Sequence, residues 1–399
     1  MNTPPSRFSR SLATPFNVGC IVGVLSLCRP QEAKAEDSVS YKYQSWQEDN
    51  GRIAVRSQDA QFAKDLGPDM TLSVMGVIDS ISGATPTGEI ARTKGGPTPT
   101  AHMEDQRRAT DLEFSRQWGI FNVTGGYGYS RESDYISRGL TLNTVTDFNQ
   151  KNTELLLGDN TTDDTIMEPK LGWLKNRKKN GNEFLVGVKQ LIDPNTTFQA
   201  NVTVGRSRGY EADPYKIVST TMLNLDPGTY YTVPENRPRH KNSVSLFLGL
   251  NHAVEKLHGA ADLSYRYYND SFGISSHTVT AAWIQDLGDH WTLQPFIRYY
   301  VQSAADFYYY NLDQSHVVTT YDTSTFETGT GNAPFYSSDS RLSHMQSFDP
   351  GLKVTWKYNA HVSIDVTFDR YVSRGLDSVT PQDAYYKARN IMVGAKYAF

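Results

Sequence analysis

The stretch "HVSIDVTFD" (residues 361–369) alternates apolar and polar side chains along its whole length. Side chains at positions i and i+2 lie on the same face of a β-strand, so this pattern predicts a strand with one apolar and one polar face. No segment of the chain shows a clear helical period. The same period of two recurs in "TTFQANVTVG" (196–205), "NSVSLFLGLN" (242–251) and "TLSVMGVID" (71–79).

The connections between the predicted strands alternate between short and long. Tight turns such as "LGPD" (66–69), "LGDH" (287–290) and "YNA" (358–360) alternate with long polar stretches. The long stretches lie near 83–103, 161–181, 209–238, 305–340 and 374–386. Transmembrane β-barrels have short turns at one rim and long loops at the other. The sequence therefore predicts an all-β fold, a transmembrane antiparallel β-barrel with short periplasmic turns, long extracellular loops and periplasmic N- and C-termini.

We expect about 16 strands, with 14 or 18 as alternatives, because the first, fourth and seventh are the least regular. They are expected near 39–48, 52–65, 69–82, 104–117, 120–132, 137–147, 152–160, 182–192, 196–208, 240–252, 258–270, 275–287, 291–304, 341–357, 361–373 and 387–399. A soluble all-β protein would alternate equally well, but it would more naturally be divided by linkers. No linker is visible between residues 36 and 399, so this segment is expected to be one domain.

Aromatic residues cluster at both ends of the predicted strands, as in the two interfacial girdles of a membrane barrel. One group lies by the tight turns: Trp118, Trp291, Trp356, Tyr358, Tyr397 and Phe399. The other lies toward the long loops: Tyr127, Tyr129, Tyr267, Tyr299 and Tyr300.

Residues 1–35 have the features of a cleaved secretory signal peptide. Arg7 and Arg10 precede the apolar run "FNVGCIVGVLSLC" (16–28), and "AKA" (33–35) has the small-x-small pattern of a cleavage site. Both cysteines of the chain fall inside this segment. The expected mature protein therefore has no cysteine, which excludes disulfides, thiol catalysis and thiolate metal sites.

Composition narrows the classes of function. The chain has 39 basic and 43 acidic residues, which argues against nucleic acid as a partner. Only 38% of its residues are hydrophobic, and beyond residue 35 no apolar run approaches the roughly 18 residues of a membrane helix. Low hydrophobicity still fits a protein that crosses a membrane with strands, because only alternate residues then face lipid.

The closing stretch "VGAKYAF" (393–399) resembles the last strand of outer-membrane proteins. Gly394, Tyr397 and Phe399 fit the Gly-x-x-aromatic-x-aromatic pattern that the β-barrel assembly machinery recognises, while Met392 occupies a slot that is normally polar. The resemblance implies an assembly signal at Gly394, Tyr397 and Phe399. Its implied partners are the assembly machinery and outer-membrane lipid, and its implied location is the outer membrane of a Gram-negative bacterium.

Seven blocks, in order, resemble the uncharacterised exported family called domain of unknown function 3570 (DUF3570). They are "YKYQSWQEDNGRIAV" (41–55), "DSISGATPTG" (79–88), "SRESDYISRGL" (130–140), "GYEADPYK" (209–216), "NDSFGISSHT" (269–278), "RYYVQSAADFYYY" (298–310) and "SSDSRLSH" (337–344). The resemblance implies an outer-membrane barrel. Genes of such proteins commonly lie near a flavin transferase, a thioredoxin-like protein and a small lipoprotein, which implies a periplasmic or surface redox partner.

Catalytic signatures are absent from the sequence, and we expect neither a cofactor nor a metal site. "SSH" (275–277) suggests the Ser–His pair of an outer-membrane lipase, but only Ser275 shares a strand face with His277. An outer-membrane lipase-like enzyme is therefore the third hypothesis for function.

The first two hypotheses concern the barrel lumen. Candidate lumen-lining residues lie on strand faces opposite the apolar stripes: Asp79, Asp262, Arg266, Arg298, Lys353, Asp365 and Asp369. Charges of both signs either line a water-filled path or pair with one another and with an inserted loop. The first hypothesis is a passive or gated channel for a small solute, and the second is a scaffold barrel that holds a partner protein. The connection 305–340 is long enough to fold inward as a constriction or to form an outward binding surface.

Overall fold

The computed structural model describes residues 37–91, 96–167, 176–221, 230–312, 321–322, 327–328 and 335–399. The predicted signal peptide, residues 1–35, lies outside the described residues.

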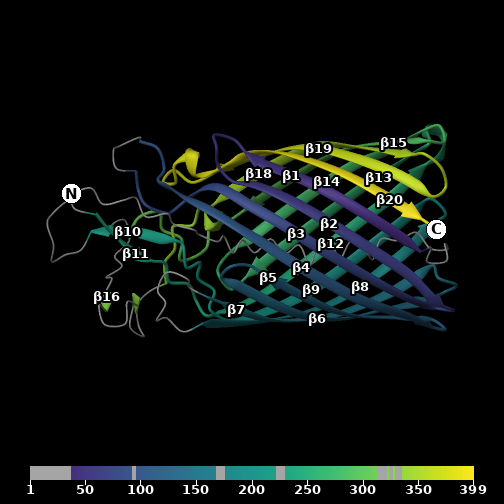
Figure 1. Cartoon of the computed structure of the whole chain (residues 1–399), viewed down its shortest axis with the longest axis horizontal. Helices are drawn as coiled ribbons and strands as arrows, with labels where there is room; N and C mark the ends of the chain where they lie inside the picture. Colours follow the sequence, from purple (N-terminus) through teal and green to yellow (C-terminus); the bar gives the residue numbers. More distant parts are fainter. Residues whose placement is uncertain are drawn as a thin grey trace.

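Sixteen antiparallel strands form one closed barrel, so the predicted fold class and strand number are confirmed (Figure 1). In order around the barrel they are β1 (Ser38–Glu48), β2 (Ala54–Gly67), β3 (Met70–Pro86), β4 (Thr100–Trp118), β5 (Phe121–Arg131), β6 (Tyr135–Phe148), β7 (Thr153–Ile166), β8 (Arg177–Asp193), β9 (Thr196–Gly209), β12 (His240–Val254), β13 (Gly259–Asp270), β14 (Ser275–Leu287), β15 (Trp291–Gln302), β18 (Met345–Lys357), β19 (Val362–Gly375) and β20 (Lys387–Ala398). The three strands with the least regular sequence are all present, and β4 is the longest strand of the barrel at 19 residues.

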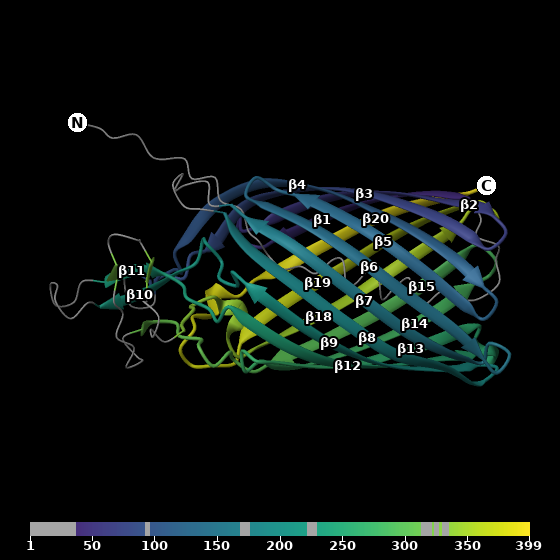
Figure 2. The same ribbon diagram turned by 90° about the horizontal axis from the view of Figure 1, so that it is seen from below.

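The barrel closes between its first and last strands. β1 pairs with β2 on one side and with β20 on the other, and Ser38 lies opposite Ala398. Both strands therefore reach the rim of tight turns, where the C-terminus lies, while the long connections gather at the other rim (Figures 1 and 2). We call these the turn-side and loop-side rims.

Alternate residues of each strand face the outside and the inside of the wall. On β19, Ile364, Val366 and Phe368 are 36%, 43% and 49% exposed, whereas the intervening Thr367 and Asp369 are each 4% exposed. A closed wall leaves its outer face accessible and crowds its inner one, so the exposed apolar residues form an outer belt and the polar residues face the interior.

The prediction that Tyr300 belongs to the outer aromatic girdle is wrong. Tyr300 lies on the inner face with Arg298 and Gln302, and its hydroxyl donates to Gln302 Oε1 at 2.6 Å. Neighbouring residues of a strand point to opposite faces, so Tyr299 and Tyr300 cannot both belong to the outer girdle.

Several of the predicted strand boundaries are wrong because the strands extend past the apolar belt. β3 runs to Pro86 and β4 begins at Thr100, which shortens the connection expected at 83–103. β7 continues to Ile166 and β8 begins at Arg177, which shortens the connection expected at 161–181. Apart from Ile166 and Gly181, the extensions of β7 and β8 consist of polar residues, which keep the ladder hydrogen bonds but no longer alternate in hydrophobicity.

The long connections contain structure that was not predicted. Among the described residues, β10 (Ile217–Thr221) pairs with β11 (Tyr230–Pro234), and β16 (Tyr321–Asp322) pairs with β17 (Glu327–Thr328). Short 3₁₀ turns occur in the long connections at η3 (Ser340–Leu342) and η4 (Gln382–Ala384), and a third, η1 (Glu255–Leu257), lies in the tight turn between β12 and β13. β18 starts at Met345 instead of near 341, because Asp339 caps η3 by accepting a hydrogen bond from the backbone N–H of Arg341.

None of the helices in the described part of the chain is long and apolar enough to cross a membrane.

Candidate functional site

The inner face of the barrel carries paired charges near β3 and β4. Asp79 is 8% exposed and accepts a hydrogen bond from Arg107 Nε at 2.7 Å. This predicted residue is therefore held in an ion pair on the inner face.

A second group of inner-face charges lies on β15, β18, β19 and β20. Asp369 accepts a hydrogen bond from Asn390 Nδ2 at 2.8 Å, and Arg298 lies directly opposite Asp349 in the strand register. Of the other predicted residues, Lys353 lies opposite Thr367 and Asp365 lies opposite Thr355. The register thus brings four of the predicted residues onto neighbouring strands of one side of the wall.

Arg266 and Arg298 are exposed although they lie on the inner face. On the opposite face of the same strands, Leu263 and Ile297, which are 45% and 40% exposed, belong to the outer belt. Arg266 shares its face with the predicted residue Asp262 and lies opposite Thr278 of β14. These two guanidinium groups are therefore not enclosed by the side chains around them.

The connections at the loop-side rim fold onto one another and form a loop cap. We define the cap as residues 83–91, 210–221, 230–239, 271–274, 303–312, 335–344 and 376–386. The inner-face residue Gln302 donates hydrogen bonds to the carbonyl oxygens of Arg341 and Ser343 at 2.9 and 2.8 Å. Arg341 and Ser343 directly follow the connection expected at 305–340, so the chain leaving this connection contacts the inner face of the wall.

A network of buried charges holds the cap together. Asp213, Glu235 and Asp339 are 6%, 6% and 3% exposed. Arg237 contacts Glu235 at 2.7 Å and Asp339 at 3.0 Å, and Arg341 contacts Asp213 at 3.0 Å and Asp339 at 2.5 Å. Two arginines therefore bridge three buried carboxylates from three segments of the cap.

The pKa values in this network reflect that bridging. Burial alone would raise the pKa of Asp339, but the cations of Arg341, Lys216 and Arg237 hold it well below its usual range. Burial lowers the pKa of Lys216, whose Nζ donates to the carbonyl oxygen of Pro86 at 2.5 Å. Asp339 is therefore kept ionised, and the cap contains a true ion-pair network.

Apolar contacts support the same cap. Phe272, Ile274, Ala305, Phe307 and Leu342 form one buried cluster, with the rings of Phe272 and Phe307 packed edge to face at 5.0 Å. A second cluster joins the β10–β11 hairpin to the connection after β15, and its members are Val218, Val233, Leu312 and Tyr336. The loops thus have cores of their own.

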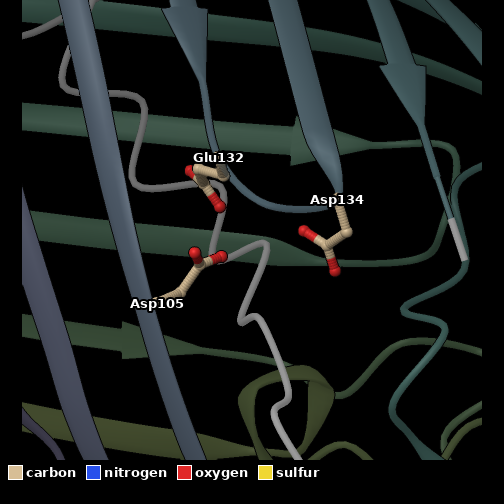
Figure 3. Close-up of side chains that lie close together, drawn as sticks. All are labelled: Asp105, Glu132 and Asp134. Carbon is tan, nitrogen blue, oxygen red and sulfur yellow. The ribbon is translucent and has the colours of Figure 1, made fainter. Parts of the chain in front are cut away.

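An acidic trio lies where β4 meets the β5–β6 turn. Figure 3 shows Asp105 on β4 with Glu132 and Asp134 from the turn, and the carboxylate oxygens of the three lie within 4.8 Å of one another. Burial and the neighbouring Asp105 and Asp134 charges raise the pKa of Glu132 to about 7. Sequence patterns did not indicate this trio, because Asp105 on β4 lies far along the chain from Glu132 and Asp134 of the β5–β6 turn.

The comparisons with known proteins bear on identity. A family model described as "Protein of unknown function (DUF3570)" matches residues 24–172 and 170–384. The chain belongs to the DUF3570 family. No curated protein shows a significant match to the sequence.

Solved structures similar to this DUF3570 chain are bacterial barrels of low sequence identity. The siderophore receptor PirA from Pseudomonas aeruginosa is 10% identical with a TM-score of 0.45, and the match covers 91% of this chain and 62% of PirA. OmpTdeltaL8, an outer membrane protein of Vibrio cholerae, is 8% identical with a TM-score of 0.42 and coverages of 92% and 99%. CdiB from Acinetobacter baumannii is 9% identical with a TM-score of 0.49 and coverages of 92% and 61%. The chain spans less than two thirds of PirA and of CdiB, and these likenesses concern the fold alone.

The blocks that resemble the DUF3570 family meet in the loop cap. Asp213 and Lys216 come from "GYEADPYK", and Asp339 and Arg341 come from "SSDSRLSH". The hydroxyl of Tyr215 donates to Asp134 of "SRESDYISRGL". Four blocks, including "DSISGATPTG" with Pro86, are thus joined by hydrogen bonds or ion pairs. The quoted blocks were the available signal for this site, but their convergence required the three-dimensional structure.

The serine and histidine of "SSH" have other partners in this DUF3570 barrel. Ser275 Oγ accepts a hydrogen bond from Asn269 Nδ2 at 2.7 Å, and His277 Nδ1 lies 2.8 Å from the hydroxyl of Tyr265. The lipase hypothesis therefore gains no geometric support from this pair.

The closing strand of this DUF3570 barrel holds the predicted assembly signal. Tyr397 and Phe399 are 52% and 53% exposed on the outer face, and their rings stack at 5.6 Å. Gly394 faces inward, where an added Cβ would lie 2.7 Å from Asp365 Oδ1. This close approach explains why a glycine fits at position 394 better than a residue with a side chain. The assembly role of the three residues stays a prediction.

Proposed function

We propose that this protein is an outer-membrane channel for a small solute and that the loop cap gates its loop-side mouth. The observation that carries the proposal is the exposure of Arg266 and Arg298 on the inner face. In a plugged interior, such charges are expected to be paired and shielded from water. Exposed arginines inside the barrel are instead what a water-filled path requires.

The proposed location follows from the outer surface of the barrel. A wall whose outer face exposes apolar residues on strand after strand needs a hydrocarbon environment. The expected signal peptide supports export. We assign the turn-side rim, with its tight turns and the N- and C-terminal ends of the barrel chain, to the periplasm. The loop cap then faces the outside of the cell.

The cap supports a gated rather than a passive channel. Its residues touch the inner face through Gln302, so it lies across part of the mouth. Arg341 is 33% exposed at its side chain although both of its partner aspartates are buried. This arginine is therefore the accessible member of the network, where a change in the cap can begin.

The test is single-channel recording of the purified protein in planar bilayers. We expect the wild type to show conductance steps with a low open probability. Removing one partner of a buried ion pair costs up to about 3–5 kcal/mol, less here because Arg341 is partly exposed. Arg341→Met should therefore loosen the cap and raise the open probability, while the barrel stays folded.

Arg374→Met is the matched control, because Arg374 is exposed near the same rim on the outer face of β19. Folding of both variants is checked by the change in gel mobility on boiling that closed barrels show. Equal open probability in wild type and Arg341→Met would mean that the cap does not gate the pore, and the protein would then be a passive channel. An absence of steps in all three proteins would favour the scaffold barrel, which holds a partner protein of an envelope redox system.

A further inference from the structure

Six exposed cations lie on the outer face of neighbouring strands near the loop-side rim. This cationic collar consists of Arg108 on β4, Arg131 on β5, Arg138 on β6, Lys178 on β8, and Arg206 and Arg208 on β9. Each shares its strand face with exposed residues of the apolar belt. The collar therefore borders the belt on its loop side.

The strand register places two of these cations directly against each other. Arg108 is the cross-strand partner of Arg131. Like charges directly opposite each other on adjacent strands destabilise a sheet. Within the described residues, the guanidinium of Arg108 donates to Gln106 Oε1 at 2.9 and 3.2 Å, and no ion pair involves Arg108 or Arg131. Within the part of the chain that the structure describes, the pair thus has no carboxylate partner that would offset its repulsion.

Acidic residues on the same outer surface do not balance the collar. Those near the loop-side rim of β4 to β9 are Glu104, Asp159 and Asp163. Asp163 contacts Lys178 at 3.8 Å, and Glu104 lies on β4 beyond Arg108, toward the loop-side rim. Six cations against three carboxylates leave this side of the rim positive.

The turn-side rim of the same strands is different. There the outer face carries Trp118, Phe121 and Phe148, which are 50%, 49% and 46% exposed. The cation Arg116 of β4 lies over the ring of Trp118 at 5.0 Å, and Lys151 is exposed in the β6–β7 turn. The excess of cations therefore belongs to one rim and to one leaflet.

We propose that the collar binds phosphate groups of lipids in the leaflet around the loop-side rim, and that Arg108 and Arg131 share one phosphate. The proposal rests on the membrane location proposed above, but not on conduction. Guanidinium groups bind phosphate through paired charge-assisted hydrogen bonds. A phosphate between the two arginines supplies the missing anion, and the apolar belt below them receives the acyl chains.

The test measures binding of lipid A, which carries two phosphates, to the full-length mature barrel in detergent by native mass spectrometry. Wild type should bind lipid A. The double variant Arg108→Gln with Arg131→Gln should bind it with an affinity lower by roughly tenfold or more. Arg116→Gln, on the same outer face of β4 at the other rim, is the matched control and should bind like wild type. Salt should weaken the wild-type interaction by screening.

The arms of the experiment separate the sources of phosphate. Dephosphorylated lipid A should bind weakly to all variants, and inorganic phosphate at the same concentration should not compete. Equal lipid A binding by wild type and the double variant would overturn the proposal, as would competition by inorganic phosphate alone.

Stability gives a second readout in case the double variant folds poorly. In lipid-free zwitterionic detergent, Arg131→Gln alone should leave the thermal midpoint unchanged or raise it, because it removes the repulsion. With lipid A, wild type should gain more stability than Arg131→Gln. If lipid A raised the thermal midpoint of both proteins equally, a shared phosphate would be contradicted. If such a barrel still conducted, the lipid proposal would fail and the proposed channel function would stand.

Discussion

At the residue scale, Glu132 is a carboxylate held close to two other carboxylates, Asp105 and Asp134, at the loop-side rim. Its pKa is raised to about 7 by burial and by the charges of Asp105 and Asp134, whereas an unfolded chain releases the same proton near pH 4.5. The folded state therefore binds more protons between these two values. Its stability must fall as pH rises through this window, by about 1.4 kcal/mol for each unit of pKa difference at most.

We predict that Glu132→Gln is more thermostable than wild type at pH 8 and equal to it at pH 4.5. The amide cannot ionise, so it removes the repulsion that grows between pH 4.5 and 7. Thermal midpoints in detergent with EDTA at both pH values measure the effect. Glu104→Gln, on the outer face of the same strand as Asp105, is the control and should show no comparable pH dependence. A Glu132→Gln advantage of the same size at both pH values would refute this assignment.

Phe399 carries the second prediction at this scale. Its ring is 53% exposed and stacks on Tyr397, so a substitution should change folded stability by only about 0.5 kcal/mol if it acts as an ordinary surface residue. If the residue belongs to the assembly signal, Phe399→Asp should lower the amount of folded barrel in cells far more than that. Quantitative semi-native gels of membrane fractions measure the folded amount.

Phe148→Asp is the matched control, because Phe148 is 46% exposed on the turn-side rim away from the closing strand. Equal losses in the two variants would remove the special role assigned to Phe399.

At the scale of elements, the strands were predictable from the sequence and the loops were not. Within the belt, the alternation in β19 fixes which residues face out, because lipid and interior impose opposite polarity. Beyond the belt both faces are polar, so the extensions of β7 and β8 leave no periodic signal. Pairing of β10 with β11 likewise depends on contacts with distant segments, such as the bridge between Asn236 and Tyr336.

The candidate site shows the same limit. The alternation of apolar and polar residues along each strand predicted that Asp79 and Asp369 face inward. Their partners Arg107 and Asn390 follow from the register between strands. The bridging of Asp213 and Asp339 by Arg341 joins positions more than a hundred residues apart. Single-sequence patterns carry local information only, so they could predict the facing of these residues but not their contacts.

At the scale of the whole molecule, the inner charge distribution determines which ions a water-filled barrel would prefer. Arg266 and Arg298 lie on β13 and β15, two strands separated only by β14. Both are exposed on the inner face, so their charges act on ions in the lumen at short range. Fixed positive charge favours anions, and salt weakens this preference by screening.

We predict that Arg266→Ala combined with Arg298→Ala leaves the barrel folded and shifts its reversal potential toward cations under a salt gradient. Removal of two lumen cations leaves inner-face carboxylates such as Asp262 and Asp365 less balanced, which sets the direction of the shift. The shift should be larger at low ionic strength, where the Debye length is roughly 30 Å at 0.01 M. Arg56→Ala with Arg374→Ala, two exposed arginines on the outer face, removes the same charge and should leave the reversal potential unchanged. An equal shift in both double variants would mean that net protein charge, rather than the lumen arginines, sets the selectivity.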